Sequence, residues 1–146
     1  MRAIHSVPLV GAVALITTLF GPPAQAEEFP PPDAVAVSAA KVARLQPGGV
    51  VEGSARVKCA PEWQAGDLSV QVDRSFTDYA QGITQPDVPC DDRWHRVRFT
   101  ATTVSGTLDP GRVTISMQFV VTHVVFGDPA GAHDTTRGRL VRAAGR

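Results

Sequence analysis

Residues 113–121 read Val-Thr-Ile-Ser-Met-Gln-Phe-Val-Val, and this stretch decides the fold class. Apolar side chains stand at every second position from Val113 to Val121, and most of the residues between them are polar. Successive side chains of a β-strand point to opposite faces, so a period of two predicts a strand with one buried face and one exposed face. No segment shows a sustained helical period. The sequence therefore predicts an all-β protein.

The same alternation continues on both sides of this stretch. Residues 51–59 alternate small or apolar residues with charged and polar ones, and residues 68–72 repeat the pattern. Weaker strand patterns cover residues 35–45, 76–83, 94–103 and 135–142, and turn-forming Gly and Pro separate the segments. About seven strands at roughly ten-residue spacing predict an antiparallel β-sandwich of two sheets, of immunoglobulin-like type.

Length and charge limit the function classes. The chain has 146 residues, with 14 basic and 14 acidic side chains. This length fits one domain. The net charge is zero, whereas nucleic-acid-binding proteins usually carry an excess of basic residues. We therefore expect no nucleic-acid partner.

Residues 1–26 are typical of a secretory signal peptide. Arg2 provides a positive start, residues 7–20 form an apolar run, and Ala24 and Ala26 are small residues spaced for signal peptidase. The apolar run is shorter than the roughly 20 residues that a transmembrane helix needs. We expect cleavage after Ala26, secretion, and no membrane attachment after cleavage.

The remainder divides into a short lead-in and one domain. Residues 27–33 contain three consecutive prolines, which predict an extended polyproline segment. Residues 34–146 are then the folded domain. Its only cysteines are Cys59 and Cys90, and an even pair in an oxidising compartment predicts one disulfide.

Several short motifs of the domain resemble a known group of proteins. They are Ala34-Val-Ala-Val-Ser, Leu45-Gln-Pro-Gly-Gly-Val-Val, the strand that ends in Cys59, Cys90-Asp-Asp-Arg-Trp94 and Val97-Arg-Phe99. Together they resemble small secreted immunoglobulin-like proteins of unassigned function from actinobacteria. This resemblance implies a fold and an export route, and it implies no activity. The chain also resembles, more weakly, the neocarzinostatin-like apoproteins of enediyne chromoproteins, which bind a ligand in a cleft but carry two disulfides.

The sequence predicts no catalytic residue, metal site or cofactor. It contains no Gly-x-Ser-x-Gly elbow, and no free Cys is expected beside a His. His123 falls on the inward side of its strand, so we expect a histidine at the edge of the core with a hydrogen-bond partner. Asp87, Asp91 and Asp92 lack the spacing of a calcium loop, and we expect them in a solvated turn.

The candidate binding patch is Trp94, Arg96 and Arg98. If Val97 and Phe99 face the core, strict alternation places these three side chains together on the outer face. Such a patch could stack on a sugar or hold an anionic polymer. A bulge near His95 would instead turn Trp94 into the core, and this is the arrangement that we expect. Trp63, Phe76 and Tyr79 form a second aromatic set, which we expect to be partly buried.

The leading functional hypothesis is a secreted, non-enzymatic binding module. Its expected partner is an extracellular protein, a cell-wall component or a glycan. The alternative is a carrier or sequestering protein for a small hydrophobic metabolite, and a small extracellular hydrolase is the third hypothesis. An apolar cleft between the sheets would favour the carrier, whereas a flat patch of aromatic and Arg side chains would favour the binding module.

Overall fold

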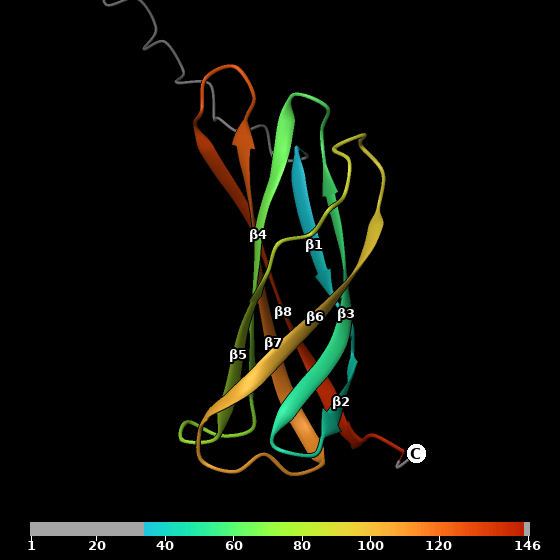
Figure 1. The fold of residues 1–146 in the computed structure, drawn as a ribbon, viewed down its shortest axis with the longest axis vertical. Helices are drawn as coiled ribbons and strands as arrows, with labels where there is room; N and C mark the ends of the chain where they lie inside the picture. The colour runs from blue at the N-terminus through green and yellow to red at the C-terminus, as the bar shows by residue number, and fades with distance from the viewer. Residues whose placement is uncertain (1–33, 145–146) are drawn as a thin grey trace, which may run out of the picture.

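The computed structural model describes residues 34–144, and this part of the chain forms eight β-strands (Figure 1). They are β1 (Val35–Ala39), β2 (Val42–Gln46), β3 (Val50–Cys59), β4 (Trp63–Asp73), β5 (Tyr79–Thr84), β6 (His95–Ser105), β7 (Gly111–His123) and β8 (Pro129–Arg142). The prediction of an all-β protein is confirmed. The expected signal peptide, residues 1–26, and the lead-in, residues 27–33, lie outside the described residues.

The structure has eight strands where about seven were predicted. The additional strand arises because residues 35–45, which were expected to form one strand, form two. β1 pairs with residues 55–59 of β3, whereas β2 pairs with residues 50–52 of β3 and also runs parallel to residues 139–142 of β8. The chain therefore changes partners between Ala39 and Val42. The turn predicted at Gln46-Pro47-Gly48-Gly49 is confirmed, and both glycines adopt the positive φ angles that glycine favours.

The sheet topology differs from two separate sheets. Hydrogen bonding runs in the order β3-β2-β8-β7-β4-β5-β6 and returns to β3, so seven strands form a closed ring. Gly82 of β5 lies so close to the backbone of Thr100 that an added Cβ would collide with its carbonyl oxygen. A glycine thus allows β5 and β6 to approach and close the ring.

The closure is confined to one end of the molecule. β5 pairs with β6 only through residues 79–81 and 102–105, and β2 pairs with only the last residues of β8. Residues 95–101 of β6 and 129–138 of β8 pair on one side only within the described chain. In Figure 1 the upper parts of β1, β3 and β6 lie to the right and those of β4, β7 and β8 to the left. The seven strands thus form one closed ring, and the expected immunoglobulin-like sandwich of two separate sheets is not clearly formed.

The core follows the predicted inward rows. Val113, Ile115, Met117, Phe119 and Val121 of β7 are all buried, which confirms the alternation of the deciding stretch. The inward row of β3 is also buried at Val51, Ala55, Val57 and Cys59. Gly53 interrupts that row, and the ring of Phe99 from the opposite position on β6 fills the space.

Two strands begin earlier than the alternation predicted. β4 begins at Trp63, and its pairing with β7 is irregular between Ala65 and Leu68, where Gly66 and Asp67 break the period of two. β8 begins at Pro129, because its pairing with β7 extends through small residues that carry no apolar signal. Within residues 34–144, no helix has the length and apolarity needed to cross a membrane.

Candidate binding face on strands β3 and β6

Trp94 lies on the molecular surface, so the expected burial of this side chain is wrong. It is 46% exposed and immediately precedes β6, in which Val97, Phe99 and Ala101 are buried and Arg96 and Arg98 are exposed. β6 pairs with β3 without a register shift from His95 to Thr102. No bulge turns the strand here, and strict alternation keeps Trp94 on the outer side with the two arginines.

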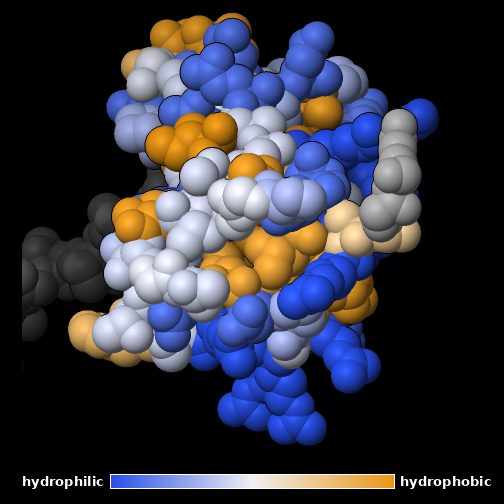
Figure 2. Space-filling model, turned by 60° about the horizontal axis from the view of Figure 1, so that its bottom comes forward, coloured by the Kyte–Doolittle hydropathy of each residue, from blue (hydrophilic) through white to orange (hydrophobic). Residues whose placement is uncertain are grey.

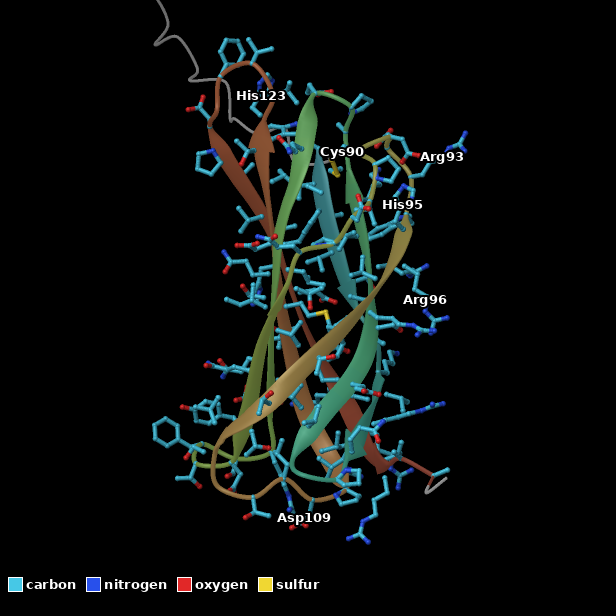
Figure 3. All side chains as sticks on the ribbon, in the orientation of Figure 1. Cys90, Arg93, His95, Arg96, Asp109 and His123 are labelled. Atoms are coloured by element: carbon cyan, nitrogen blue, oxygen red, sulfur yellow. A yellow bond between two sulfur atoms is a disulfide. The ribbon has the colours of Figure 1, made fainter. Side chains whose placement is uncertain are left out.

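The pairing of β3 with β6 adds a third arginine to this face. Arg56 stands directly opposite Arg96, and Ser54 stands opposite Arg98. The Arg56 guanidinium carbon is 5.4 Å from the centre of the Trp94 ring, and Arg96 donates a 3.2 Å hydrogen bond from Nη2 to Ser54 Oγ. Figure 3 shows Arg96 pointing away from the molecule. We call Arg56, Trp94, Arg96 and Arg98 the aromatic-arginine face.

The arginines of this face have no carboxylate partners within residues 34–144. The ion pairs in this range join Lys58 to Asp92, Arg74 to Asp109 and His95 to Asp91. Like charges directly opposite each other on neighbouring strands destabilise a sheet. The pairing of Arg56 with Arg96 therefore leaves a concentrated positive charge that no carboxylate of residues 34–144 neutralises.

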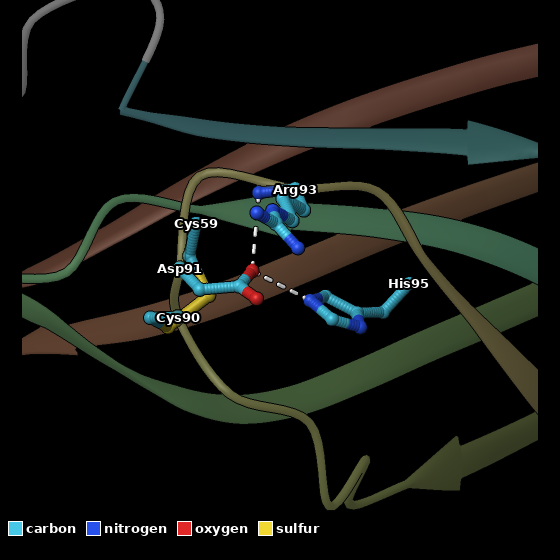
Figure 4. Close-up of a disulfide and its surroundings, with 5 residues drawn as sticks. All are labelled: Cys59, Cys90, Asp91, Arg93 and His95. Atoms are coloured by element: carbon cyan, nitrogen blue, oxygen red, sulfur yellow. Dashed lines mark hydrogen bonds and ion pairs between the residues drawn. A yellow bond between two sulfur atoms is a disulfide. The ribbon is translucent and has the colours of Figure 1, made fainter.

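A disulfide fixes the segment that leads to Trp94. Cys59 and Cys90 are bonded, as predicted, and this joins the end of β3 to the loop before β6 (Figure 4). In that loop Asp91 Oδ1 accepts a 2.7 Å hydrogen bond from His95 Nε2 and a 3.1 Å bond from the Arg93 backbone N–H. The His95 bond, helped by the Arg93 amide, lowers the pKa of Asp91 from its ordinary value of 3.8. Asp91 thus holds the residues on both sides of Trp94.

The neighbouring aspartates also serve the loop. Asp92 has a φ of 61°, donates its backbone N–H to the Cys59 carbonyl and forms a 3.1 Å ion pair with Lys58. Asp87 is exposed, as the solvated-turn interpretation requires. In the part of the chain that the structure describes, no group of three or more His, Cys, Asp or Glu side chains could hold a metal ion.

His123 and His133 lie outside the aromatic-arginine face, at the end of β7 and on β8. His123 is buried at the end of β7, and its Nδ1 accepts hydrogen bonds from the backbone N–H groups of Val125 and Phe126, which confirms the expected core-edge histidine. Its ring packs edge-on against Trp63, with 5.0 Å between ring centres. His133 is exposed, and the next residue, Asp134, accepts a 2.8 Å hydrogen bond from the Ala39 N–H.

The second aromatic set does not form a common surface. Trp63 is buried, Tyr79 is half-buried, and Phe76 is 100% exposed in the turn between β4 and β5. The expectation of partial burial is therefore wrong for Phe76, because the strand begins only at Tyr79.

An open hollow of about 550 Å³ lies elsewhere, over β4, β5, β7 and β8. Its lining is mixed, with amide and hydroxyl side chains such as Gln71, Gln81, Ser116 and Gln118 beside apolar residues. His133 also lines it, and Ile83 is the exposed apolar side chain there. The hollow lies on the outer face of these strands, so it differs from an apolar cleft between two sheets, which would favour a carrier of hydrophobic molecules.

Arg56 is the member of the face that sequence analysis missed. Its position on the outward row of residues 51–59 was evident from the alternation, but its pairing with Arg96 depends on strand register. No model of a known protein family matches the chain, and no match is found among curated proteins. The function must therefore be argued from the site itself.

Proposed function

We propose that the protein is a secreted, non-enzymatic binding module of immunoglobulin-like type, and that its aromatic-arginine face binds an anionic glycan or cell-wall polymer. The observation that carries this proposal is the direct pairing of Arg56 with Arg96 beside an exposed Trp94, without a carboxylate partner in the described chain. An anionic ligand would supply the missing negative charge.

The chemistry of the face supports a charged sugar polymer. Guanidinium groups bind carboxylate, sulfate and phosphate groups with two parallel hydrogen bonds. The flat apolar ring of Trp94 offers a surface on which a sugar ring can stack, and nearly half of that side chain is exposed. The three arginines extend along two paired strands, which suits a repeating ligand better than a small one.

Secretion is supported by two independent features. Residues 1–26 have the pattern of a signal peptide, and the Cys59–Cys90 disulfide suits an oxidising compartment.

The arrangement of β1, β3 and β6 on one side and of β4, β7 and β8 on the other supports the immunoglobulin-like type. We prefer the binding module to the carrier because the hollow over β4 and β5 is an open hollow with a mixed lining on the outer face of the strands. We prefer it to the hydrolase because the buried His123 uses Nδ1 to hold a loop.

The test compares Trp94→Ala with Phe76→Ala, which removes another exposed aromatic ring. Purified variants are mixed with insoluble bacterial cell wall and with immobilised acidic polysaccharides, and the bound fraction is measured against salt concentration. We expect binding to fall at least tenfold in Trp94→Ala and in Arg96→Gln, to stay unchanged in Phe76→Ala, and to weaken with salt.

Stability provides the check on folding. Because Trp94 is on the surface, Trp94→Ala should change the free energy of unfolding by less than about 1 kcal/mol. Binding that is equal in wild type and Trp94→Ala would refute the proposed face. Failure of the wild type to bind any acidic polymer at low salt would refute the proposed ligand class.

A further inference from the structure

A second cationic site lies on the outer face of β7 and β8, away from the aromatic-arginine face. A hollow of about 820 Å³ is lined there by Lys41, Arg112, Arg137 and Arg139, together with Arg74 and Asp73. It lies at the lower end of the molecule, near Asp109 in Figure 3. Figure 2 brings this end forward and shows mainly hydrophilic side chains around a few hydrophobic ones.

Strand register brings the cations of this hollow together. Arg112 of β7 stands directly opposite Arg139 of β8, and Arg137 stands opposite Thr114 on the same outer face. The backbone N–H of Arg139 donates a 2.7 Å hydrogen bond to the carbonyl of Lys41, which fixes Lys41 beside the pair. Three separate segments of the chain therefore deliver positive charge to one concave surface.

The hollow contains too little negative charge to balance these groups. Arg74 is neutralised by Asp109, with 2.7 Å between Nη1 and Oδ2. Asp73 is the only carboxylate in the lining, and its Oδ1 accepts a 2.7 Å hydrogen bond from Gln71. Among residues 34–144, no ion pair joins Lys41 or the other three arginines to a carboxylate.

The geometry points to a second binding site here, for a ligand that carries two or more clustered phosphate groups. Guanidinium forks match the oxygen atoms of phosphate, and three arginines with one lysine can bind several phosphates at once. The hollow contains no exposed aromatic side chain, which separates it from the sugar-stacking surface at Trp94. This site is independent of the proposed function.

The test uses inorganic tripolyphosphate and long-chain polyphosphate as probes, measured by isothermal titration calorimetry at low salt. Arg112→Gln and Arg139→Gln are compared with Arg93→Gln, which removes an exposed arginine at the other end of the molecule. We expect each hollow variant to weaken binding about tenfold or more, since hydrogen bonds to charged groups are among the strong ones. Arg93→Gln should bind like the wild type.

Backbone amide shifts locate the site and separate it from the aromatic-arginine face. Tripolyphosphate should shift the amide signals of Gly111 and Gly138, which line the hollow, at lower concentration than those of Trp94 and Arg96. Binding of tripolyphosphate would indicate a small ligand, whereas binding of long chains alone would indicate a polymer. No binding of either probe, or equal loss in Arg93→Gln, would overturn the inference without affecting the test at Trp94.

Discussion

Strands β3 and β6 and strands β7 and β8 each place one arginine opposite another, but the surroundings of the two pairs differ. Arg56 and Arg96 lie beside an exposed Trp94, whereas Arg112 and Arg139 line a hollow without an exposed aromatic ring. Each pair costs some stability, because like charges repel across a ladder. The comparison shows that one small sheet can carry two cationic surfaces that differ in shape and in aromatic content.

The distribution of charge explains why the two cationic surfaces could not be predicted from the amino-acid composition. Most acidic side chains of residues 34–144 lie in loops, such as Glu62, Asp78, Asp87 and Asp128, whereas many arginines of this range lie on the outer rows of strands. A net charge of zero for the whole chain therefore conceals two local positive regions. Composition excluded a uniformly basic protein, but it could not exclude anion binding at one face.

The largest expected effect comes from removing the disulfide, which supports only one of the two surfaces. The double variant Cys59→Ser, Cys90→Ser should lose about 2–5 kcal/mol of unfolding free energy, because the bond closes a long loop in the unfolded chain. Chemical denaturation measures this loss. At temperatures where the variant stays folded, acidic-polymer binding at Trp94 should weaken more than phosphate binding at Arg139. Equal weakening at both sites would contradict the separation of the two surfaces.

A smaller effect is expected from reversing one charge of each pair. Arg96→Glu and Arg112→Glu should each raise the unfolding free energy by about 0.2–1 kcal/mol, since a cross-strand repulsion becomes an attraction. Each variant should also lose binding at its own surface and keep it at the other. Thermal unfolding and the two binding assays measure these outcomes, with Arg96→Gln and Arg112→Gln as controls that remove charge without reversing it. Loss of stability in both Glu variants would show that the paired arginines do not repel.

The inward rows and the disulfide could be predicted from sequence because both depend on local signals. Alternation alone placed Phe119 and Met117 in the core, and the lone pair of cysteines could only bond to each other. The closed end could not be predicted, since it depends on close approach at Gly82 and on the change of partners between β1 and β2. Pairing between strands that are far apart in sequence produces no periodic pattern of apolar residues from which it could be predicted.

The positions on β6 could be predicted from the sequence, but the pairing of arginines across strands could not. Alternation from Val97 correctly gave the outward positions of Trp94, Arg96 and Arg98, and the error was to expect a bulge near His95. The pairing of Arg56 with Arg96, and of Arg112 with Arg139, required the register of strands far apart in sequence. Register is set by the packing of the whole sheet.

The smallest effect concerns pH and again distinguishes the two surfaces. The folded pKa of Asp91 is lowered by its bonds from His95 and Arg93, so its contribution to stability is present above the ordinary value of 3.8 and is lost as pH falls through the lowered pKa. Asp91→Asn should therefore melt slightly below the wild type at pH 7, and the gap should close as the pH falls below 3.8. Thermal melts across this range measure the gap. A gap that widens in acid would contradict the assignment.

The hydrogen bond that the Ala39 N–H donates to Asp134 has a consequence for the unpaired edge of β8. Residues 129–138 of β8 have no ladder partner on one side within the described chain, where β1 lies close by without pairing. An unpaired edge invites a strand from another molecule to add. Asp134 is only partly exposed, and its carboxylate reaches the Ala39 N–H at the end of β1. An intruding strand would have to displace this bond and leave a carboxylate at the new junction. The side chain therefore protects this unpaired edge of β8.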